Sequence, residues 1–320
     1  MDRSISGKSL AIQSVNSLYW QNLIRGIMKN WTLYLLILPS FIILVLFVYL
    51  PMYGIVIAFQ NFTPALGIGG SPWVGFANFE RFFRSFQFVT VIRNTITLSL
   101  YTIVVTFPLP IIMALGVNQM RVQSFRKVFQ VATYLPHFIS TVVLVGLMLL
   151  VLSPSVGIVG NVARLLGVEP INIVGIPTSF PHLFVGSIVW QHTGWDSIIF
   201  LAALSAVDPT LYEAANVDGA TKFQKLRYID FPSILPTMVT LLILRSGTLM
   251  SVGFERVFLM QNPLNIMHSE VIATYVYRIG LLNAQFSLSA AVSLFNNVIN
   301  FILLVMVNQF SRRVSENSLW

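Results

Sequence analysis

Long apolar runs alternate with shorter polar segments along the chain. A membrane-spanning helix needs about 20 consecutive, mostly apolar residues, and six runs reach that length. They cover, approximately, residues 33–53, 92–117, 129–152, 182–207, 234–252 and 287–310. Leu, Ile, Val and Phe follow one another there without the alternation of a lipid-facing barrel strand, so helices are the better way to satisfy the backbone in lipid. The pattern predicts an all-α integral membrane protein, a bundle of about six transmembrane helices.

Composition supports a lipid environment. Of 320 residues, 56% are hydrophobic and 9% are charged, and the mean hydropathy is +0.78. Soluble domains carry about 25% charged residues, so this chain cannot cover a water-facing surface. There is no cysteine, which excludes disulfides, thiol catalysis and thiolate metal sites. The net charge of +8 comes from scattered basic residues, so we expect a lipid membrane and no nucleic acid as a partner.

The basic residues between the runs indicate the topology. If the N-terminus is cytoplasmic, all five lysines fall in cytoplasmic segments, together with half of the fourteen arginines. This bias follows the positive-inside rule and predicts a multi-pass protein with both termini in the cytoplasm. Residues 1–30 would form a cytoplasmic segment, either an interfacial helix or a loosely ordered tail. Residues 31–313 would form the transmembrane domain, and residues 314–320 a cytoplasmic tail.

The polar segment between the fourth and fifth runs predicts two short helices joined by a sharp turn. Asp208 suits an N-cap, and a proline follows it at the first helical position. Gly219 suits the left-handed residue that closes the first helix. Thr221 and Gln224 have the spacing of a capping box for the second helix, which we expect to end before Pro232.

The face of this elbow suggests two alternatives. Ala214 and Ala215 would give a smooth surface on which another protein can sit closely, and Glu213 would supply one charged contact. A solvated loop that only joins two spans would explain the same residues. The spacing by itself leaves both alternatives open.

A family resemblance favours docking. Glu213-Ala214-Ala215, then Gly219, then Ile229-Asp230-Phe231-Pro232 resembles the cytoplasmic signature of permease subunits of binding-protein-dependent ABC importers, with Phe231 in place of the usual leucine. Asn94-Thr95 and Trp73-Val74-Gly75-Phe76 fit the same family. The C-terminal part is similar to the branch that imports oligosaccharides and polysaccharides, including fragments of alginate and rhamnogalacturonan.

The resemblance implies a type I ABC importer permease fold in the bacterial cytoplasmic membrane. Two permease subunits would form the pore, two cytoplasmic ATPase subunits would bind ATP and Mg, and an extracytoplasmic solute-binding protein would deliver the oligosaccharide. The elbow of residues 208–232 would be the coupling element. Its expected ATPase-coupling residues are Glu213, Ala214, Ala215, Gly219 and Pro232.

The chain itself is expected to be a non-catalytic subunit without a cofactor or metal. No phosphate-loop pattern, no His-Glu-x-x-His and no Gly-x-Ser-x-Gly occurs in the sequence. An ion-coupled secondary transporter or channel is the alternative. Such a protein typically shows inverted repeats and intramembrane carboxylates, whereas Asp196 is the only acidic residue within a predicted span.

Polar residues of the fourth run are candidates for a substrate path. Gln191, Trp195 and Asp196 lie on neighbouring turns of one predicted helix, together with His192. An aromatic ring beside hydrogen-bonding groups suits a sugar. Pairing of Asp196 with His192 inside the bundle would explain the same residues.

The fifth and sixth runs add further candidates. Arg245 is too costly to face lipid and would contact either an acidic sugar or a partner such as Asp196. Asn296 and Asn297, with Asn300 one turn on, form a polar stripe in the sixth run. Either substrate binding or hydrogen bonding between helices accounts for this stripe.

Overall fold

The structure of the protein is a computed structural model that describes residues 25–26 and 28–314. The chain divides into two units, Met1–Val56 and Ile57–Trp320, so the division falls inside the predicted transmembrane domain. Most of the predicted N-terminal segment, residues 1–30, and most of the predicted C-terminal tail, residues 314–320, lie outside the described residues.

The described part of the chain is helical. The first unit contains α2 (Trp31–Leu44), a π-helical turn (Val45–Tyr49) and α3 (Leu50–Met52), followed by a 3-10 segment that starts at Tyr53. The α-helices of the second unit are α4 (Gly67–Gly70), α5 (Ala77–Phe83), α6 (Gln87–Thr106), α7 (Pro108–Asn118), α8 (Gln123–Tyr134), α9 (Thr141–Leu152), α10 (Ile158–Leu165), α11 (Phe180–Ser205), α12 (Pro209–Val217), α13 (Lys222–Lys225), α14 (Phe231–Ser246), α15 (Phe254–Met260), α16 (Ile266–Ser269), α17 (Ile272–Tyr277) and α18 (Phe286–Val314).

Shorter turns connect these helices. They are π-helical at η6 (Leu226–Asp230) and at Arg278–Leu282, and 3-10 at Leu135–Phe138, Ile173–Gly175 and Pro177–Ser179. The described residues contain no β-strand; Gln60 and Trp73 form an isolated antiparallel bridge.

Four helices are long and apolar enough to cross a membrane, and two bent pairs raise the number to as many as six in the described part of the chain. The four are Trp31–Phe59, Gln87–Asn118, Lys222–Ser246 and Phe286–Arg312. They correspond to the first, second, fifth and sixth apolar runs. The prediction of an all-α membrane protein with about six spans is therefore confirmed.

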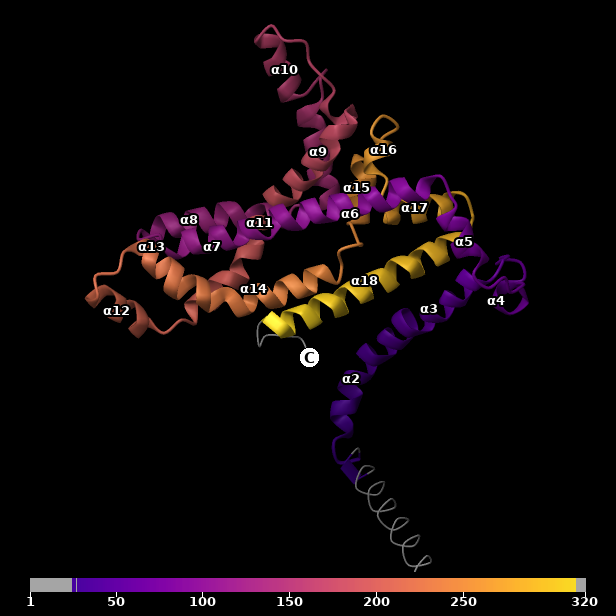
Figure 1. Cartoon of the computed structure of the whole chain (residues 1–320), viewed down its shortest axis with the longest axis horizontal. Helices are drawn as coiled ribbons and strands as arrows, with labels where there is room; N and C mark the ends of the chain where they lie inside the picture. The colour runs from indigo at the N-terminus through magenta and orange to yellow at the C-terminus, as the bar shows by residue number, and fades with distance from the viewer. Residues whose placement is uncertain (1–24, 27, 315–320) are drawn as a thin grey trace, which may run out of the picture. The chain divides into compact units, whose positions relative to one another are not determined.

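The third run does not form the single straight helix that its hydropathy predicts. Gln123–Phe138 and Thr141–Leu152 meet at an angle of 99°, and α9 turns away from α8 (Figure 1). Pro136 lies in the 3-10 turn before the bend, and the Ser140 side chain accepts a hydrogen bond from the Val143 N–H to start α9. A proline followed by a new N-cap ends one helix and begins another.

The prediction that the second elbow helix ends before Pro232 is wrong. Helices α13 and α14, joined by η6, form one continuous helix of 25 residues, Lys222–Ser246. The π-helical turn ends at Asp230, two residues before the proline. Its wider backbone gives room for the ring, and the proline occupies the first turn of α14. The elbow is thus connected rigidly to the fifth span.

The fifth helix ends earlier than predicted, at Ser246 instead of near residue 252. Asn300 of α18 explains the early end, because its side-chain oxygen accepts from the Met250 N–H at 2.8 Å and its amide nitrogen donates to Ser251 Oγ at 2.9 Å. These bonds attach Met250 and Ser251, in the non-helical segment of residues 247–253, to α18. Irregular backbone inside a membrane is tolerated where protein groups satisfy it.

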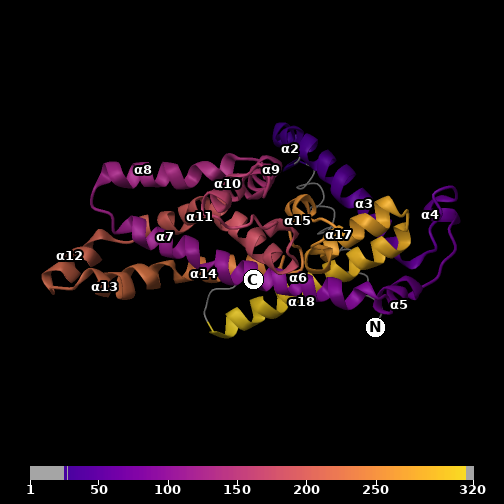
Figure 2. The same cartoon turned by 90° about the horizontal axis from the view of Figure 1, so that it is seen from above.

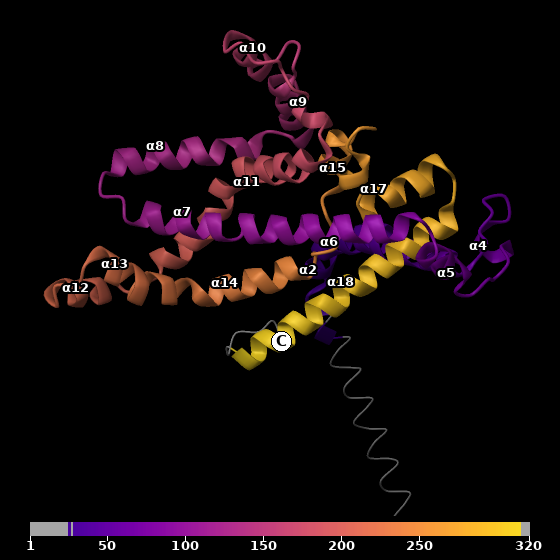
Figure 3. The same ribbon diagram turned by 45° about the horizontal axis from the view of Figure 1, so that its top comes forward.

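Helix α11 is central to the second unit. It packs against α6, α7, α8 and α14, while α18 packs against α5, α14 and α17. One buried apolar cluster joins α7, α11 and α14. Figures 1, 2 and 3 show α12 and α13 at one end of this unit, with α4 and α5 at the opposite end. The elbow therefore projects beyond the ends of the helices that it connects.

Candidate functional site

The first elbow helix begins as the sequence predicts. The Asp208 side chain accepts a hydrogen bond from the Thr210 N–H at 2.9 Å and caps α12. Hydrogen bonding to the Thr210 backbone and side chain lowers the pKa of Asp208, because both bonds favour the charged carboxylate. The cap remains ionised at neutral pH.

The turn of the elbow is closed by backbone hydrogen bonds. Gly219 has φ of +73°, and the Ala220 N–H donates to the Ala215 carbonyl at 2.8 Å while the Gly219 N–H donates to Asn216. This is a Schellman motif. Thr221 and Gln224 then form the predicted capping box. The angle between α12 and α13 is therefore fixed by local chemistry.

A buried carboxylate attaches the elbow to the bundle. Asp230, in η6, has 0% exposed surface. Its Oδ1 accepts from the Tyr212 hydroxyl of α12 at 2.5 Å, and its Oδ2 accepts from Gln119 Nε2, just beyond α7, at 2.8 Å. Burial, and then the bond to Asp230, raise the pKa of Tyr212 from 10.0 to about 12. One side chain thus connects α12, the end of α7 and the start of α14.

Sequence reasoning missed Tyr212 and Gln119. Asp230 offered a signal, because a carboxylate between Ile229 and Phe231 needs hydrogen-bonding partners once it is buried. The partners lie 18 and 111 residues away, so no local pattern could name them.

The outer face of the elbow combines small, charged and apolar residues. The predicted coupling residues Glu213, Ala214, Gly219 and Pro232 are exposed, and Ala215 is half-buried. Four large apolar or aromatic side chains are exposed around them, namely Leu211, Val217, Phe223 and Tyr228, with Val217 at 88%. Large exposed apolar patches on a protein surface typically mark contact sites.

A second polar cluster lies where α14 ends. Arg245 donates from one terminal nitrogen to Asp196 Oδ2 of α11 at 2.6 Å, and from the other to Thr106 Oγ1 of α6 at 3.2 Å. Its guanidinium carbon is 5.9 Å from the centre of the Phe107 ring. Of the two partners considered for Asp196, the structure pairs it with Arg245 and not with His192.

The ion pair is only partly buried. The Arg245 and Asp196 side chains are 33% and 28% exposed, and ion pairs that stay open to solvent contribute about 0.2–1 kcal/mol. Arg245 lines two cavities, of about 180 and 410 Å³, whereas Asp196 lines the larger one. Arg245 is therefore shared by both cavities, and its partner Asp196 lines only the larger one.

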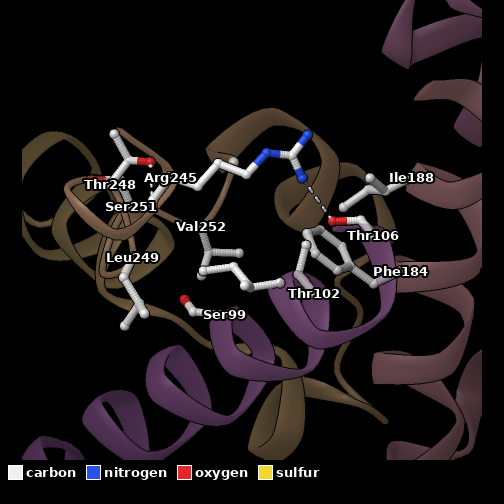
Figure 4. Close-up of a pocket in the computed structure, with 12 residues that line it drawn as sticks. Ser99, Thr102, Thr106, Phe184, Ile188, Arg245, Thr248, Leu249, Ser251 and Val252 are labelled. Carbon is white, nitrogen blue, oxygen red and sulfur yellow. Dashed lines mark hydrogen bonds between the residues drawn. The ribbon is translucent and has the colours of Figure 1, made fainter. Parts of the chain in front are cut away.

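The smaller cavity is lined by hydroxyl groups and apolar side chains. Figure 4 shows Arg245 reaching across it toward Thr106. Its polar lining consists of Ser99, Thr102, Thr106, Thr248, Ser251 and Arg245, and its apolar lining includes Phe184, Leu249 and Val252. Hydroxyl donors and acceptors beside apolar surface match the two kinds of surface that a sugar presents. Sequence reasoning missed the α6 hydroxyls, although Ser99, Thr102 and Thr106 recur at helical spacing.

The fourth-run candidates separate into two groups. Gln191 is buried, donates to the Ile139 carbonyl at 2.6 Å and accepts from Arg256, so its amide is engaged within the protein. Trp195 lines the larger cavity with Asp196 and stacks on His137, with the ring centres 4.3 Å apart. The structure thus brings Trp195, Asp196 and Arg245 together but keeps Gln191 apart.

The sixth-run asparagines do not join this group. Asn297 is exposed and Asn296 is half-buried, and neither lines the two cavities at Arg245. Asn300 is engaged with the segment after α14. A substrate role for Asn296 and Asn297 stays a prediction.

Comparison with known proteins gives the family. The model of the family described as "Binding-protein-dependent transport system inner membrane component" matches residues 106–316. The chain belongs to this family of permeases. The matched region contains both the elbow and Arg245.

Individual relatives of this permease cover nearly its whole length. It is 40% identical over 298 residues to the polygalacturonan/rhamnogalacturonan transport system permease protein YteP of Bacillus subtilis, covering 93% of this chain and 92% of that protein. It is 37% identical over 288 residues to protein LplB of the same organism, covering 90% and 91%.

A solved structure is similar at the level of the whole fold. A crystal structure of a bacterial ABC transporter involved in the import of the acidic polysaccharide alginate contains a chain that is 38% identical to this permease, with a TM-score of 0.85, covering 92% of this chain and 99% of that one. A second crystal structure shows the bacterial alginate transporter in complex with an alginate pentasaccharide-bound periplasmic protein, with 37% identity and the same TM-score.

Replacing Tyr212 with phenylalanine tests the buried attachment of the elbow. The change leaves one oxygen of Asp230 without its donor, so we expect the permease to lose about 1.5–3 kcal/mol of stability, the usual contribution of a hydrogen bond to a charged group. Thermal unfolding of the purified permease measures this loss. Phe replacement of the exposed Tyr228 is the control and should have no such effect.

The titration of Tyr212 is a second readout. Because its pKa is raised in the folded state, the stabilisation is present below pH 10.0 and is lost as the pH rises toward about 12. Ultraviolet titration of the native permease should therefore lose a late-ionising tyrosine in the Tyr212→Phe variant. An unchanged late component would contradict the buried bond.

Proposed function

We propose that this chain is the permease subunit of a bacterial ABC importer for oligosaccharides that carry carboxylates, such as oligogalacturonates. It forms half of a pore with a second permease subunit in the cytoplasmic membrane, with both termini in the cytoplasm. Two ATPase subunits that bind ATP and Mg supply the energy, and an extracytoplasmic solute-binding protein delivers the sugar. The names of the relatives, which concern polygalacturonan, rhamnogalacturonan and alginate, support an acidic sugar.

The continuous helix Lys222–Ser246 carries this proposal. Its first residues belong to the elbow, and its last turn holds Arg245 at the hydroxyl-lined cavity. A groove on an ATPase subunit would receive the exposed face of the elbow around Glu213, Ala214 and Ala215. Movement of the ATPase would then reach the cavity through one rigid element, in keeping with rocking of a helix pair as a route to alternating access.

The chemistry around the cavity suits an acidic sugar. In the smaller cavity, hydroxyl groups of α6 and of the segment after α14 can bind sugar hydroxyls, and in the larger cavity Trp195 offers a partly exposed aromatic face. Arg245 supplies a positive charge in planar, forked form that matches a carboxylate. Nearby, the buried Arg256 is bonded to the neutral side chains of Ser187 and Gln191.

The alternative of an ion-coupled secondary transporter or channel is not favoured by any of these features. The permease family and the elbow both connect this chain to transport driven by partner proteins. Reconstitution distinguishes the two. In liposomes that contain the complete importer and its solute-binding protein, uptake of trigalacturonate should require ATP. Uptake driven by a proton or sodium gradient without ATP would contradict the proposal.

Gly219 provides a test of coupling through the elbow. A β-branched residue at positive φ is strained by about 1–2 kcal/mol, so Gly219→Val should lower sugar-stimulated ATP hydrolysis by the importer about tenfold. No neighbouring atom lies within 4 Å of a Cβ added at this position, so the cause is backbone strain and not a clash. Gly219→Asn, which tolerates the left-handed conformation, is the matched control and should retain most of the coupling.

Two further observations keep the Gly219 test interpretable. The same trigalacturonate-loaded solute-binding protein is supplied to both variants, so a difference in ATP hydrolysis arises in the importer and not in sugar binding by that protein. Normal stimulation in a well-assembled Gly219→Val importer would show that the elbow geometry does not transmit the ATPase movement.

Arg245 provides a test of substrate class. Arg245→Gln removes the charge but retains a hydrogen-bonding group, so uptake of trigalacturonate should fall at least about tenfold, as expected for the loss of a charged hydrogen bond. Uptake of the methyl-esterified trisaccharide, which has no charge, should fall much less. Equal losses for both sugars would mean that Arg245 does not select a carboxylate.

A further inference from the structure

The Arg245–Asp196 pair joins the two helices that flank the elbow. Asp196 belongs to α11, which ends at Ser205 and leads directly into α12. Arg245 belongs to α14, which continues α13 without interruption. The ion pair therefore connects α11 and α14 at a level remote from the elbow, while the elbow connects them at their ends. Any change in the angle between α11 and α14 must alter one of these two connections.

A single hydrogen bond joins the side chains of Arg245 and Asp196. Arg245 uses one terminal nitrogen for Asp196 and the other for Thr106, and Asp196 engages it through Oδ2. A guanidinium has five N–H donors in a fork that can hold both oxygens of a carboxylate. A two-point contact is available to Arg245, and the pair as it stands does not use it.

Arg245 is also held by groups other than Asp196. Thr106 accepts its hydrogen bond at 3.2 Å, and the Phe107 ring lies 5.9 Å from its guanidinium carbon. Both residues lie where α6 ends and α7 begins. These contacts keep the guanidinium at the cavity whether or not Asp196 is bound to it.

Both side chains are accessible to a ligand. Each is about one-third exposed, and both line the cavity of about 410 Å³. A sugar carboxylate in this cavity would carry the same charge and the same pair of oxygens as Asp196. It would therefore compete with Asp196 for one binding partner.

We propose that Asp196 is a built-in substitute for the substrate carboxylate, which occupies Arg245 until an acidic sugar displaces it. The exchange releases α11 from α14, so the helices that flank the elbow separate when acidic cargo is present. A neutral sugar cannot displace Asp196 and leaves the two helices joined. The inference rests on the proposed function, and it predicts that an importer without acidic cargo hydrolyses ATP slowly.

The first test is the rate of ATP hydrolysis by the complete importer in liposomes. Asp196→Asn removes the competing charge and should raise the rate without sugar at least about fivefold, the low end of typical coupling between sites. The further stimulation by trigalacturonate on its solute-binding protein should shrink correspondingly. Asp196→Glu retains a carboxylate and should return most of the wild-type dependence on sugar.

A matched control breaks an ion pair elsewhere. Glu80→Gln removes the exposed pair with Arg84 in α5, which lies at the end of the unit opposite the elbow (Figure 1), and should leave the rate without sugar unchanged. The methyl-esterified trisaccharide is the control ligand. Intrinsic fluorescence of the solute-binding protein verifies that it is loaded with each sugar before the rates are compared.

The second test measures the separation of α11 and α14 directly. The chain has no cysteine, so Ser205→Cys and Leu242→Cys introduce the only thiols of this subunit for spin labels, one on each helix. In the complete importer the distance distribution should shift with trigalacturonate and stay unchanged with its methyl ester. In Arg245→Gln the shifted distribution should be present without sugar.

The outcomes separate this inference from the proposed function. If the wild-type importer takes up trigalacturonate with ATP, but Asp196→Asn has an unchanged rate without sugar and the label distances do not respond to sugar, the exchange is refuted and the function stands. If Asp196→Asn fails to assemble, the label distances in the wild-type background still decide the matter. If the wild-type importer does not take up trigalacturonate, the proposed function itself fails.

Discussion

One hydrogen-bonded carboxylate, that of Asp230, makes the elbow part of the helix bundle. It is fully buried and is bonded by Tyr212 from α12 and Gln119 from the end of α7. A buried charge is tolerated only when its partners are in place. The three segments must therefore keep their relative positions, and the elbow cannot swing freely on its connections.

Because the elbow is held in place, the continuous helix that follows it can transmit movement. The π-helical turn containing Asp230 leads without a break into α14, whose last turn holds Arg245 beside the hydroxyl-lined cavity. A force applied to the exposed face of α12 and α13 would reach that cavity through backbone hydrogen bonds and not through a flexible loop. The partly exposed pair of Arg245 with Asp196 is weak by comparison, so it is the connection that can change.

The features that the sequence predicted best are those that depend on residues close together in the chain. The N-cap at Asp208, the left-handed Gly219 and the capping box of Thr221 and Gln224 depend on residues at most a few positions apart, and the structure confirms each. The apolar runs likewise predicted the membrane helices, since hydropathy follows directly from composition. The structure departed from these predictions where a distant group or a proline intervened, as at the bend before α9 and at the end of α14 set by Asn300.

The candidate site was predictable only in part for the same reason. Arg245 and Asp196 stand out as charges in apolar runs, yet they lie 49 residues apart, and nothing in the sequence shows that they meet. The α6 hydroxyls of the cavity are ordinary residues of an apolar helix and became candidates only through their position around Arg245. Gln191 is the opposite case. Its amide and its position in an apolar run suggest a sugar ligand, but in the structure Arg256 and a backbone carbonyl engage it.

If the elbow and the cavity are two ends of one rigid helix, substitutions at the two ends should not act independently, and a double-mutant cycle measures this. ATP-dependent uptake of trigalacturonate by the complete importer would be measured for Tyr212→Phe, Arg245→Gln and the double variant. Distant, independent sites give additive effects within about 0.3–0.5 kcal/mol. A rigid connection predicts a larger departure from additivity, because each change weakens the coupling through the same helix. Additive effects would contradict a rigid connection.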